Sequence, residues 1–222
     1  MNFTISEENY IKAIFRLQSA GKPVSTNALA LELDTKPASV TDMLKKLKAK
    51  KLVLYSPYQG CKLSGEGSKL ALSIVRRHRL WEYFLAEKLQ FNWDEVHEVA
   101  EELEHVSSKQ LIERLDAYLG FPRFDPHGDP IPDSSGKIAI PDLVKLTTLR
   151  PHDRARVSGL ADQSADMLNL LQQRNINIGT IVTVNKKFDF DKSLEIEIPE
   201  NIPFVISEQT AQNILVRYEP ES

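Results

Sequence analysis

Apolar positions recur with helical spacing in three stretches of the first fifty residues. Residues 7–20 have them every three or four positions, which predicts an amphipathic helix. A short helix is expected at residues 27–33, after Ser25 or Thr26, either of which can cap it. A third is expected at residues 37–50, because the fixed φ of Pro37 suits the first helical position.

The pattern then changes to two short apolar runs around a tight turn. Residues 52–55 and 61–63 are predicted to be strands of a hairpin, with the turn at residues 57–60. Two helices, a basic third helix and a hairpin are the order of a winged helix-turn-helix domain, whose third helix enters the major groove of DNA. A generic small α/β domain is the alternative.

The rest of the chain divides into a helical and a strand-rich part. Helices are predicted at residues 64–88, 94–103 and 107–119, with more apolar surface than one short helical hairpin buries, so we expect a helix-packed homodimer. Residues 123–140, rich in Pro and Gly, are expected to form a linker or ordered loop. Five strands and one helix then predict a small β-barrel; the strands are at residues 155–160, 180–184, 194–198, 204–207 and 214–218, and the helix is at 165–173.

Charge is unevenly distributed along these 222 residues. The net charge of the whole chain, −3, would argue against a nucleic-acid partner, but its parts differ in sign. Residues 1–75 carry 11 Lys and Arg against 6 Asp and Glu, whereas residues 76–135 carry 7 Lys and Arg against 13 Asp and Glu. A basic surface for phosphates beside an acidic cation site is therefore expected. The apolar runs are too short to span a bilayer, the first ten residues do not resemble a signal peptide, and the single cysteine excludes an internal disulfide. We expect a cytoplasmic protein.

Histidines and carboxylates share helix faces in the acidic segment. Helical spacing places His97, Glu101, Glu104 and His105 on one face, and His78 and Glu82 on one face of the preceding helix. A single His is usually a surface or core residue, but this set together predicts a cation site. Nitrogen and oxygen donors without sulfur favour Mn²⁺ or Fe²⁺ over a structural zinc ion.

Four segments and one loop carry a family resemblance: residues 6–11, 40–43, 77–80 and 96–107, and Asp125-Pro126-His127-Gly128. Over nearly its whole length the chain resembles the DtxR/MntR family, the diphtheria toxin repressors and manganese transport regulators. The resemblance implies a mainly α fold with β structure. It comprises a winged helix-turn-helix domain at residues 1–64, a helical metal-binding and dimerisation domain with a hinge loop at 65–140, and an SH3-like (FeoA-like) barrel at 141–222.

The family binds Mn²⁺ or Fe²⁺ in a dimer and represses metal-uptake genes, so the resemblance implies a repressor of double-stranded operator DNA and not an enzyme. Carried over by position, the primary metal site would use Asn9, His78, Glu101, Glu104 and His105. An ancillary site would use Glu82, His97, Asp125 and His127, with Asp162, Gln163 or Asp166 from the barrel. Turn capping is the alternative role for Asp125 and His127, and helix capping for Gln163 and Asp166.

Three positions bear on the metal. Glu101 favours Mn²⁺, because iron-responsive members have Cys there and a hard carboxylate suits Mn²⁺ better than a thiolate does. Asn9 departs from the family pattern by offering an uncharged amide oxygen. Lys12 departs from it by standing where some manganese-responsive members have a ligand Glu.

A cation held jointly by the first helix and the dimerisation helices would fix the angle between the two recognition helices of the dimer. Contacts with DNA are expected from Ala38, Ser39, Thr41, Asp42, Lys45, Lys46, Tyr58 and Gln59. Two other functions stay open: a metalloenzyme that uses the His/Glu cage, and a winged-helix regulator that senses an organic ligand.

Overall fold

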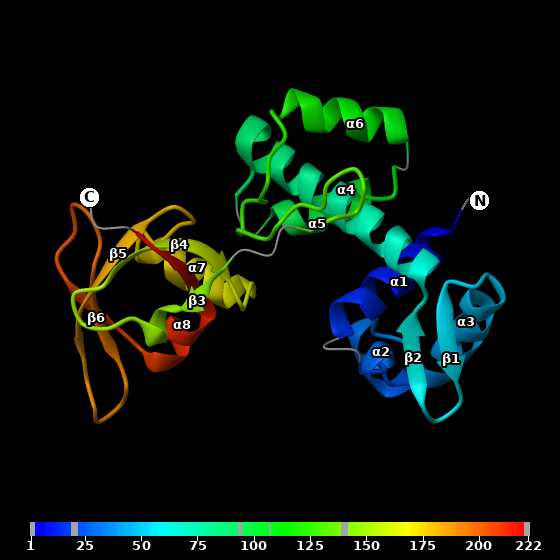
Figure 1. Cartoon of the computed structure of the whole chain (residues 1–222), viewed down its shortest axis with the longest axis horizontal. Helices are drawn as coiled ribbons and strands as arrows, with labels where there is room; N and C mark the ends of the chain where they lie inside the picture. Colours follow the sequence, from blue (N-terminus) through cyan, green and yellow to red (C-terminus); the bar gives the residue numbers. More distant parts are fainter. Residues whose placement is uncertain (1–2, 19–21, 93–94, 107, 139–141, 220–222) are drawn as a thin grey trace. The chain divides into compact units, whose positions relative to one another are not determined.

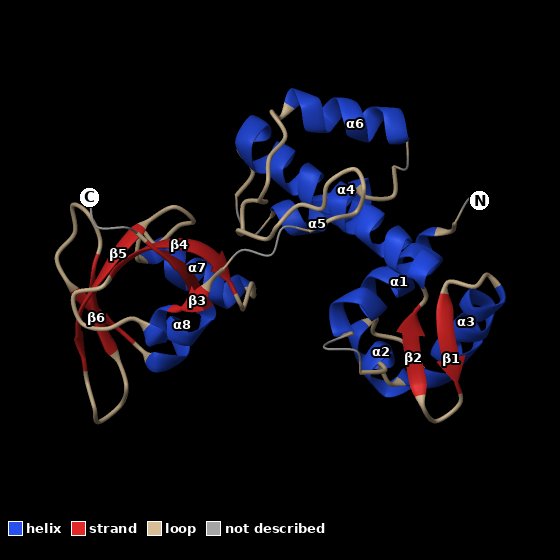
Figure 2. Cartoon of the chain, in the orientation of Figure 1, coloured by secondary structure: helices blue, strands red, loops and turns tan. Residues whose placement is uncertain are grey.

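The computed structural model describes residues 3–18, 22–92, 95–106, 108–138 and 142–219, and Figure 1 labels their helices and strands. The chain forms two compact units. The first contains Met1–Trp81, Ala100–Phe121 and Pro132–Ile138, and the second contains Glu82–Val99, Pro122–Ile131 and Ala139–Ser222. Within the described parts, strands occur in a short hairpin of the first unit and in the sheet of the second (Figure 2).

The first unit begins with three helices and the hairpin: α1 (Ile5–Leu17), α2 (Thr26–Glu32), α3 (Pro37–Ala49), β1 (Val53–Ser56) and β2 (Gly60–Leu63). Helix α1 starts two residues earlier than its apolar pattern predicts, because Thr4 and Glu7 form a capping box. Ser25 caps α2, and Pro37 is the first residue of α3. The predicted winged helix-turn-helix is confirmed.

The hairpin is antiparallel and packs on the helices through a shared apolar core. Gly60 begins β2 with φ +82°, and a Cβ there would lie 2.5 Å from the carbonyl oxygen of Val24. Only glycine allows both this left-handed backbone and this approach. Ile11 and Ile14 of α1 and Leu44 and Leu47 of α3 are completely buried in the core.

Three further helices follow: α4 (Gly65–Leu89), α5 (Val96–Leu103) and α6 (Lys109–Tyr118). They correspond to the three predicted helices, of which two were expected to begin at positions 94 and 107, outside the described residues. Ser108 caps α6 by accepting a hydrogen bond from the backbone N–H of Leu111. In the part of the chain that the structure describes, no helix is both long enough and apolar enough to cross a membrane.

The second unit contains a six-stranded antiparallel sheet with the strand order β3-β8-β4-β5-β6-β7. Its elements are β3 (Val144–Lys145), a 3-10 turn at Leu146–Thr148, β4 (Arg154–Leu160), α7 (Ala165–Gln173), β5 (Ile181–Lys187), β6 (Leu194–Glu197), β7 (Phe204–Ile206), α8 (Glu208–Asn213) and β8 (Ile214–Tyr218). The prediction of five strands and one helix was wrong in number, because β3 and α8 are too short to show a period. The predicted fold class, mainly α with a small C-terminal β domain, is confirmed. The boundaries 1–64, 65–140 and 141–222 stay a prediction.

Candidate metal centre

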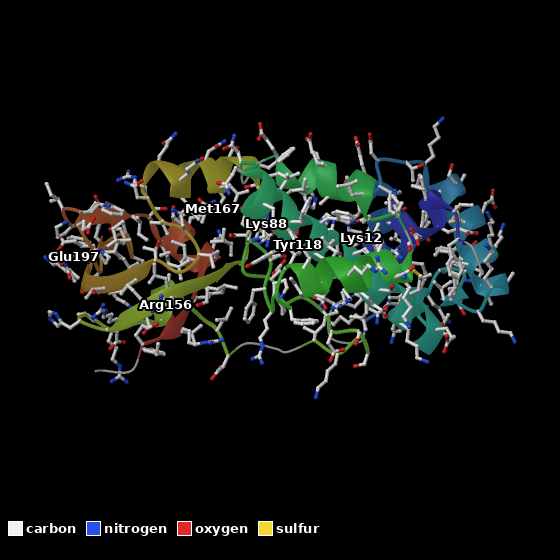
Figure 3. All side chains as sticks on the ribbon, turned by 90° about the horizontal axis from the view of Figure 1, so that it is seen from above. Lys12, Lys88, Tyr118, Arg156, Met167 and Glu197 are labelled. Atoms are coloured by element: carbon white, nitrogen blue, oxygen red, sulfur yellow. The ribbon has the colours of Figure 1, made fainter. Side chains whose placement is uncertain are left out.

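A buried group of ionisable side chains connects α1, α4 and the end of α5 in the first unit. The ammonium Nζ of Lys12 lies 2.6 Å from Oε2 of Glu104 and 3.4 Å from Oε1 of Glu101. The Nδ1 atom of His78 lies 2.7 Å from the same Oε2 of Glu104. Lys12 is 8% exposed and Glu104 is 1% exposed, so water contributes little to their solvation. Figure 3 labels Lys12 among the helices.

The surroundings of Glu104 favour its ionised form. Burial by itself would raise the pKa of this carboxyl, but the hydrogen bond from His78 and the positive charge of Lys12 outweigh burial and lower the pKa below its usual value. Oε2 of this ionised carboxylate is thus already engaged by both Lys12 and His78.

A second layer of contacts orients His105. Its Nδ1 lies 2.7 Å from Oε2 of Glu8, and Nη2 of Arg77 donates to Oε1 of Glu8 at 2.8 Å. The other ring nitrogen, Nε2, lies 3.9 Å from Oε1 of Glu104. A carboxylate on the remote nitrogen is the usual way to fix a ligand imidazole. Neither Glu8 nor Arg77 was predicted from the sequence to have a role at the site, although both lie in segments that carry the family resemblance, residues 6–11 and 77–80.

The predicted primary residues come together in the first unit. A cavity of about 340 Å³ is lined by four of them: Asn9, Glu101, Glu104 and His105. The fifth, His78, does not line the cavity but contacts Glu104, which does. The oxygen and nitrogen donors suit Mn²⁺ or Fe²⁺. Lys12 lines the same cavity, however, and its ammonium lies between the two carboxylates. This arrangement does not fit a metal ion in addition to Lys12.

The predicted ancillary residues meet in the second unit. Oε1 of Glu82 lies 3.1 Å from Nδ1 of His97 and 4.0 Å from Nε2 of His127. Glu82 and His127 are buried, and the side chain of His97 is 46% exposed. Among the described residues, the ligand atoms of His78, Glu82 and His97 all lie within 4.8 Å of one another, which fits the donor set of one divalent cation. His127 brings a further nitrogen to within 4.0 Å of the Glu82 carboxylate.

The loop that carries His127 has the turn predicted as the alternative role for Asp125. Oδ1 of Asp125 accepts hydrogen bonds from the backbone N–H groups of His127 and Asp129, both at 2.9 Å. Nε2 of Gln163 donates to Oδ2 of Asp129 at 3.2 Å, so the start of α7 lies against this loop. Asp125 therefore shapes the loop in addition to any contact with a metal.

The other two barrel residues lie at the beginning of α7. Asp162 accepts a hydrogen bond from the backbone N–H of Ser164, and Ser164 caps the helix. Asp166 is exposed in the first turn. The predicted helix-capping role of Gln163 and Asp166 is thus filled by Ser164.

The residues expected to contact DNA lie on α3 and on the turn between β1 and β2. The exposed members are Ala38, Ser39, Asp42, Lys45, Lys46, Tyr58 and Gln59, and Thr41 is half-buried. Two of the lysines have acidic partners: Lys45 lies 3.1 Å from Asp42, and Lys46 lies 3.1 Å from Glu7. Both keep about half or more of their side chain exposed. The basic helix therefore presents ammonium groups at the surface.

Three family models match successive parts of the chain. The family described as "Iron dependent repressor, N-terminal DNA binding domain" matches residues 2–61, and "Iron dependent repressor, metal binding and dimerisation domain" matches residues 64–133. The chain belongs to the DtxR/MntR family of metal-dependent transcriptional repressors. The family described as "FeoA domain" matches residues 144–218.

Individual proteins of the DtxR/MntR family are similar to this chain in sequence and in fold. The chain is 27% identical to the diphtheria toxin repressor of Corynebacterium jeikeium over 184 residues, 81% of this chain and 76% of that protein. It is 35% identical to the regulator MntR of Oceanobacillus iheyensis over 112 residues, 50% of this chain and 76% of that protein. A solved manganese-dependent transcriptional repressor in complex with manganese superposes with a TM-score of 0.82 at 33% identity, covering 96% of this chain and 100% of its own.

The DtxR/MntR domains indicate the partners in general terms. A DNA-binding domain and a dimerisation domain indicate DNA and a second copy of the chain. The family includes manganese-dependent and iron-dependent members, and it is made of transcriptional repressors.

Proposed function

We propose that this chain is a homodimeric, metal-dependent repressor that binds double-stranded operator DNA and controls genes of metal-ion uptake, with Mn²⁺ as its effector and Fe²⁺ as the alternative. The observation that carries the proposal is the set of close ligand atoms on His78, Glu82 and His97, in a chain whose first domain is a winged helix-turn-helix.

Helix α3 and the hairpin turn make the DNA contacts in this proposal. Ser39, Thr41, Lys45 and Lys46, with Tyr58 and Gln59 on the turn, contact phosphates and set the register on the duplex. Ala38 and Asp42 lie nearest the bases. Because few of these groups can read base edges, much of the affinity comes from phosphate contacts and DNA shape.

Glu82 and His97 would hold the metal together with His78, which lies one turn before Glu82 on α4. His127 would add a nitrogen beside Glu82, with Asp125 shaping the loop behind it. A bound divalent cation supplies the positive charge that draws these ligands together. The residues connect α4, α5 and the loop of residues 125–129, so their joint ligation orders the helices of the dimerisation domain. Linkage then requires that DNA raise the affinity for metal as much as metal raises the affinity for DNA.

A mobility-shift assay with duplexes selected from a random library tests this function. We expect Mn²⁺ to raise the affinity at least tenfold and added salt to lower it steeply, since phosphate contacts release counterions. Binding that ignores both Mn²⁺ and Fe²⁺ would contradict the proposal.

Variants of Glu82 and His127 test the metal site in that assay. His127→Ala and Glu82→Gln should weaken Mn²⁺ binding at least tenfold and abolish the metal-dependent shift. His152→Asn is the matched control, because His152 is exposed, lies outside the cluster and has a φ of 73° that Asn tolerates.

A further inference from the structure

Lys12 is a buried cation at the centre of the residues expected to form the primary metal site. Its Nζ is within 3.4 Å of the carboxylates of Glu101 and Glu104, and 3.3 Å from Nδ1 of His78. These three contacts come from α4, α5 and the turn after α5, while Lys12 itself belongs to α1. The ammonium therefore connects the same elements that a shared metal ion would connect.

The charges of this group are already nearly balanced. Glu8, Glu101 and Glu104 contribute three negative charges, and Lys12 and Arg77 contribute two positive charges, which leaves one net negative charge in the group defined by these contacts. A divalent cation placed among the same carboxylates would approach an ammonium that is only 8% exposed, so bulk water screens the repulsion between the two charges poorly. The Lys12 ammonium and a divalent cation therefore cannot both be bound by the carboxylates of Glu101 and Glu104.

The position of Lys12 in α1 also restricts where its charge can go. The residues on either side, Ile11 and Ala13, are buried in the core of the first unit. Glu8, one turn earlier, is held by Arg77 and His105. With the helix fixed in this way, moving the ammonium out of the cavity means breaking its 2.6 Å contact with Glu104. The Glu104 carboxylate, 1% exposed, would then keep His78 as a partner but lose its ammonium.

We propose that Lys12 is the resident, covalently attached cation among Glu101, Glu104 and His105, so that these residues take no metal and the metal response of the chain belongs to Glu82 and His97, with His78 and His127 beside them. The inference rests on the proposed function and specifies its sensing site. In this chain the connection between α1 and the helices after it is permanent and does not depend on metal.

Metal stoichiometry tests the proposal with the full-length protein and Mn²⁺ alone. We expect isothermal titration and elemental analysis after gel filtration to give one Mn²⁺ per chain for the wild type. Glu101→Gln should still bind one Mn²⁺, because Glu101 is half exposed and its loss leaves the Lys12–Glu104 pair intact. Glu82→Gln should bind none.

Replacing Lys12 should open Glu101, Glu104 and His105 to a metal ion. Lys12→Glu supplies a carboxylate in place of the ammonium and should bind two Mn²⁺ per chain, and adding Glu101→Gln to it should weaken the second ion at least tenfold. Lys12→Arg keeps the cation and should stay at one. Lys50→Met removes a lysine that is paired with Glu7, away from the cavity, and should also stay at one.

The outcomes distinguish failure of the proposed role of Lys12 from failure of the proposed repressor function. Two Mn²⁺ per wild-type chain, with one lost in Glu101→Gln, would overturn the role of Lys12 and leave a metal-dependent repressor. A Lys12→Glu protein that folds, as judged by its thermal unfolding, and still binds one Mn²⁺ would also overturn it. A wild type that binds no Mn²⁺ and no Fe²⁺ would refute the proposed function itself.

Discussion

Glu7 is a completely buried carboxylate that connects the first turn of α1 to α3. It accepts a hydrogen bond from the backbone N–H of Thr4 at 3.0 Å, and its oxygens lie 2.7 Å from Nζ of Lys50 and 3.1 Å from Nζ of Lys46. Burial alone would raise its pKa, but Lys50, Thr4 and Lys46 outweigh burial and lower the pKa from 4.5 to about 2. The ionised form is therefore the one that the fold stabilises.

Glu7→Gln should lower the free energy of unfolding by about 2 kcal/mol near neutral pH, the usual range for a hydrogen bond to a charged group. Because the folded pKa lies below the unfolded one, the stabilisation by Glu7 is present above pH 4.5 and is lost as the pH falls toward 2. Urea unfolding between these pH values should therefore show a shallower pH dependence in the variant. Glu66→Gln, in an exposed pair with Lys69, should change stability by less than about 0.5 kcal/mol. Equal slopes for wild type and Glu7→Gln would contradict this account.

At the residue scale, the sequence could predict which neighbouring side chains gather but not which distant segments meet. The helical spacing of Glu101, Glu104 and His105 grouped them as one set, and the structure does bring them together. They do not share one helix face, because α5 ends at Leu103 and the last two lie in the turn after it. Lys12 lies 92 positions from Glu104 in the chain, so only packing brings the ammonium to that carboxylate. The sequence marked Lys12 as a departure from the family pattern, but its central position depends on tertiary structure.

At the element scale, periodicity and capping decided what could be predicted. Helix α7 has the bounds predicted for it, because its nine residues show a clear apolar period. Helix α8 has six residues, of which Ala211 is buried, so it offers no period. Its cap, Ser207, was the only local signal and was interpreted as the end of a strand.

The loop that carries Asp125 and His127 is held to β4 by the close approach of Gly128. Gly128 has φ +85°, and a Cβ there would lie 2.4 Å from the carbonyl oxygen of Ser158. Gly128→Ala must therefore shift the loop, and we expect about tenfold weaker Mn²⁺ binding in a calorimetric titration.

Gly179→Ala is the matched control for the loop variant. Gly179 also has a left-handed backbone, with φ +95°, but among the described residues other than its chain neighbours no atom lies within 4 Å of where its Cβ would be. The substitution should cost about 1 kcal/mol of stability and leave the Mn²⁺ affinity unchanged. Equal Mn²⁺ affinities for Gly128→Ala and Gly179→Ala would contradict the role of the loop.

At the scale of the whole molecule, the charge of each segment predicted where the DNA-binding and metal-site residues lie, which the net charge of the chain did not. The basic first segment contains the winged helix-turn-helix, and the acidic middle contains Glu82, Glu101 and Glu104 of the two clusters. What the sequence could not predict is the division into two compact units that each contain part of α4 and α5. That division depends on contacts between segments distant in the chain.

A dimer requires an apolar surface, and α6 with the turn after it has one. Leu111, Tyr118 and Phe121 are 40%, 67% and 66% exposed, and the first two are seven residues apart, on one face of the helix. Tyr118→Glu places a charge on this face, so we expect a fall from two chains to one in analytical ultracentrifugation and at least tenfold weaker operator binding. The Mn²⁺ bound per chain should not change, since neither metal-site cluster includes α6.

Phe190→Glu, at a fully exposed position between β5 and β6, is the matched control and should stay dimeric. A Tyr118→Glu protein that remains a dimer at micromolar concentration would remove this face from the interface, and the two-fold pairing of recognition helices would need another surface.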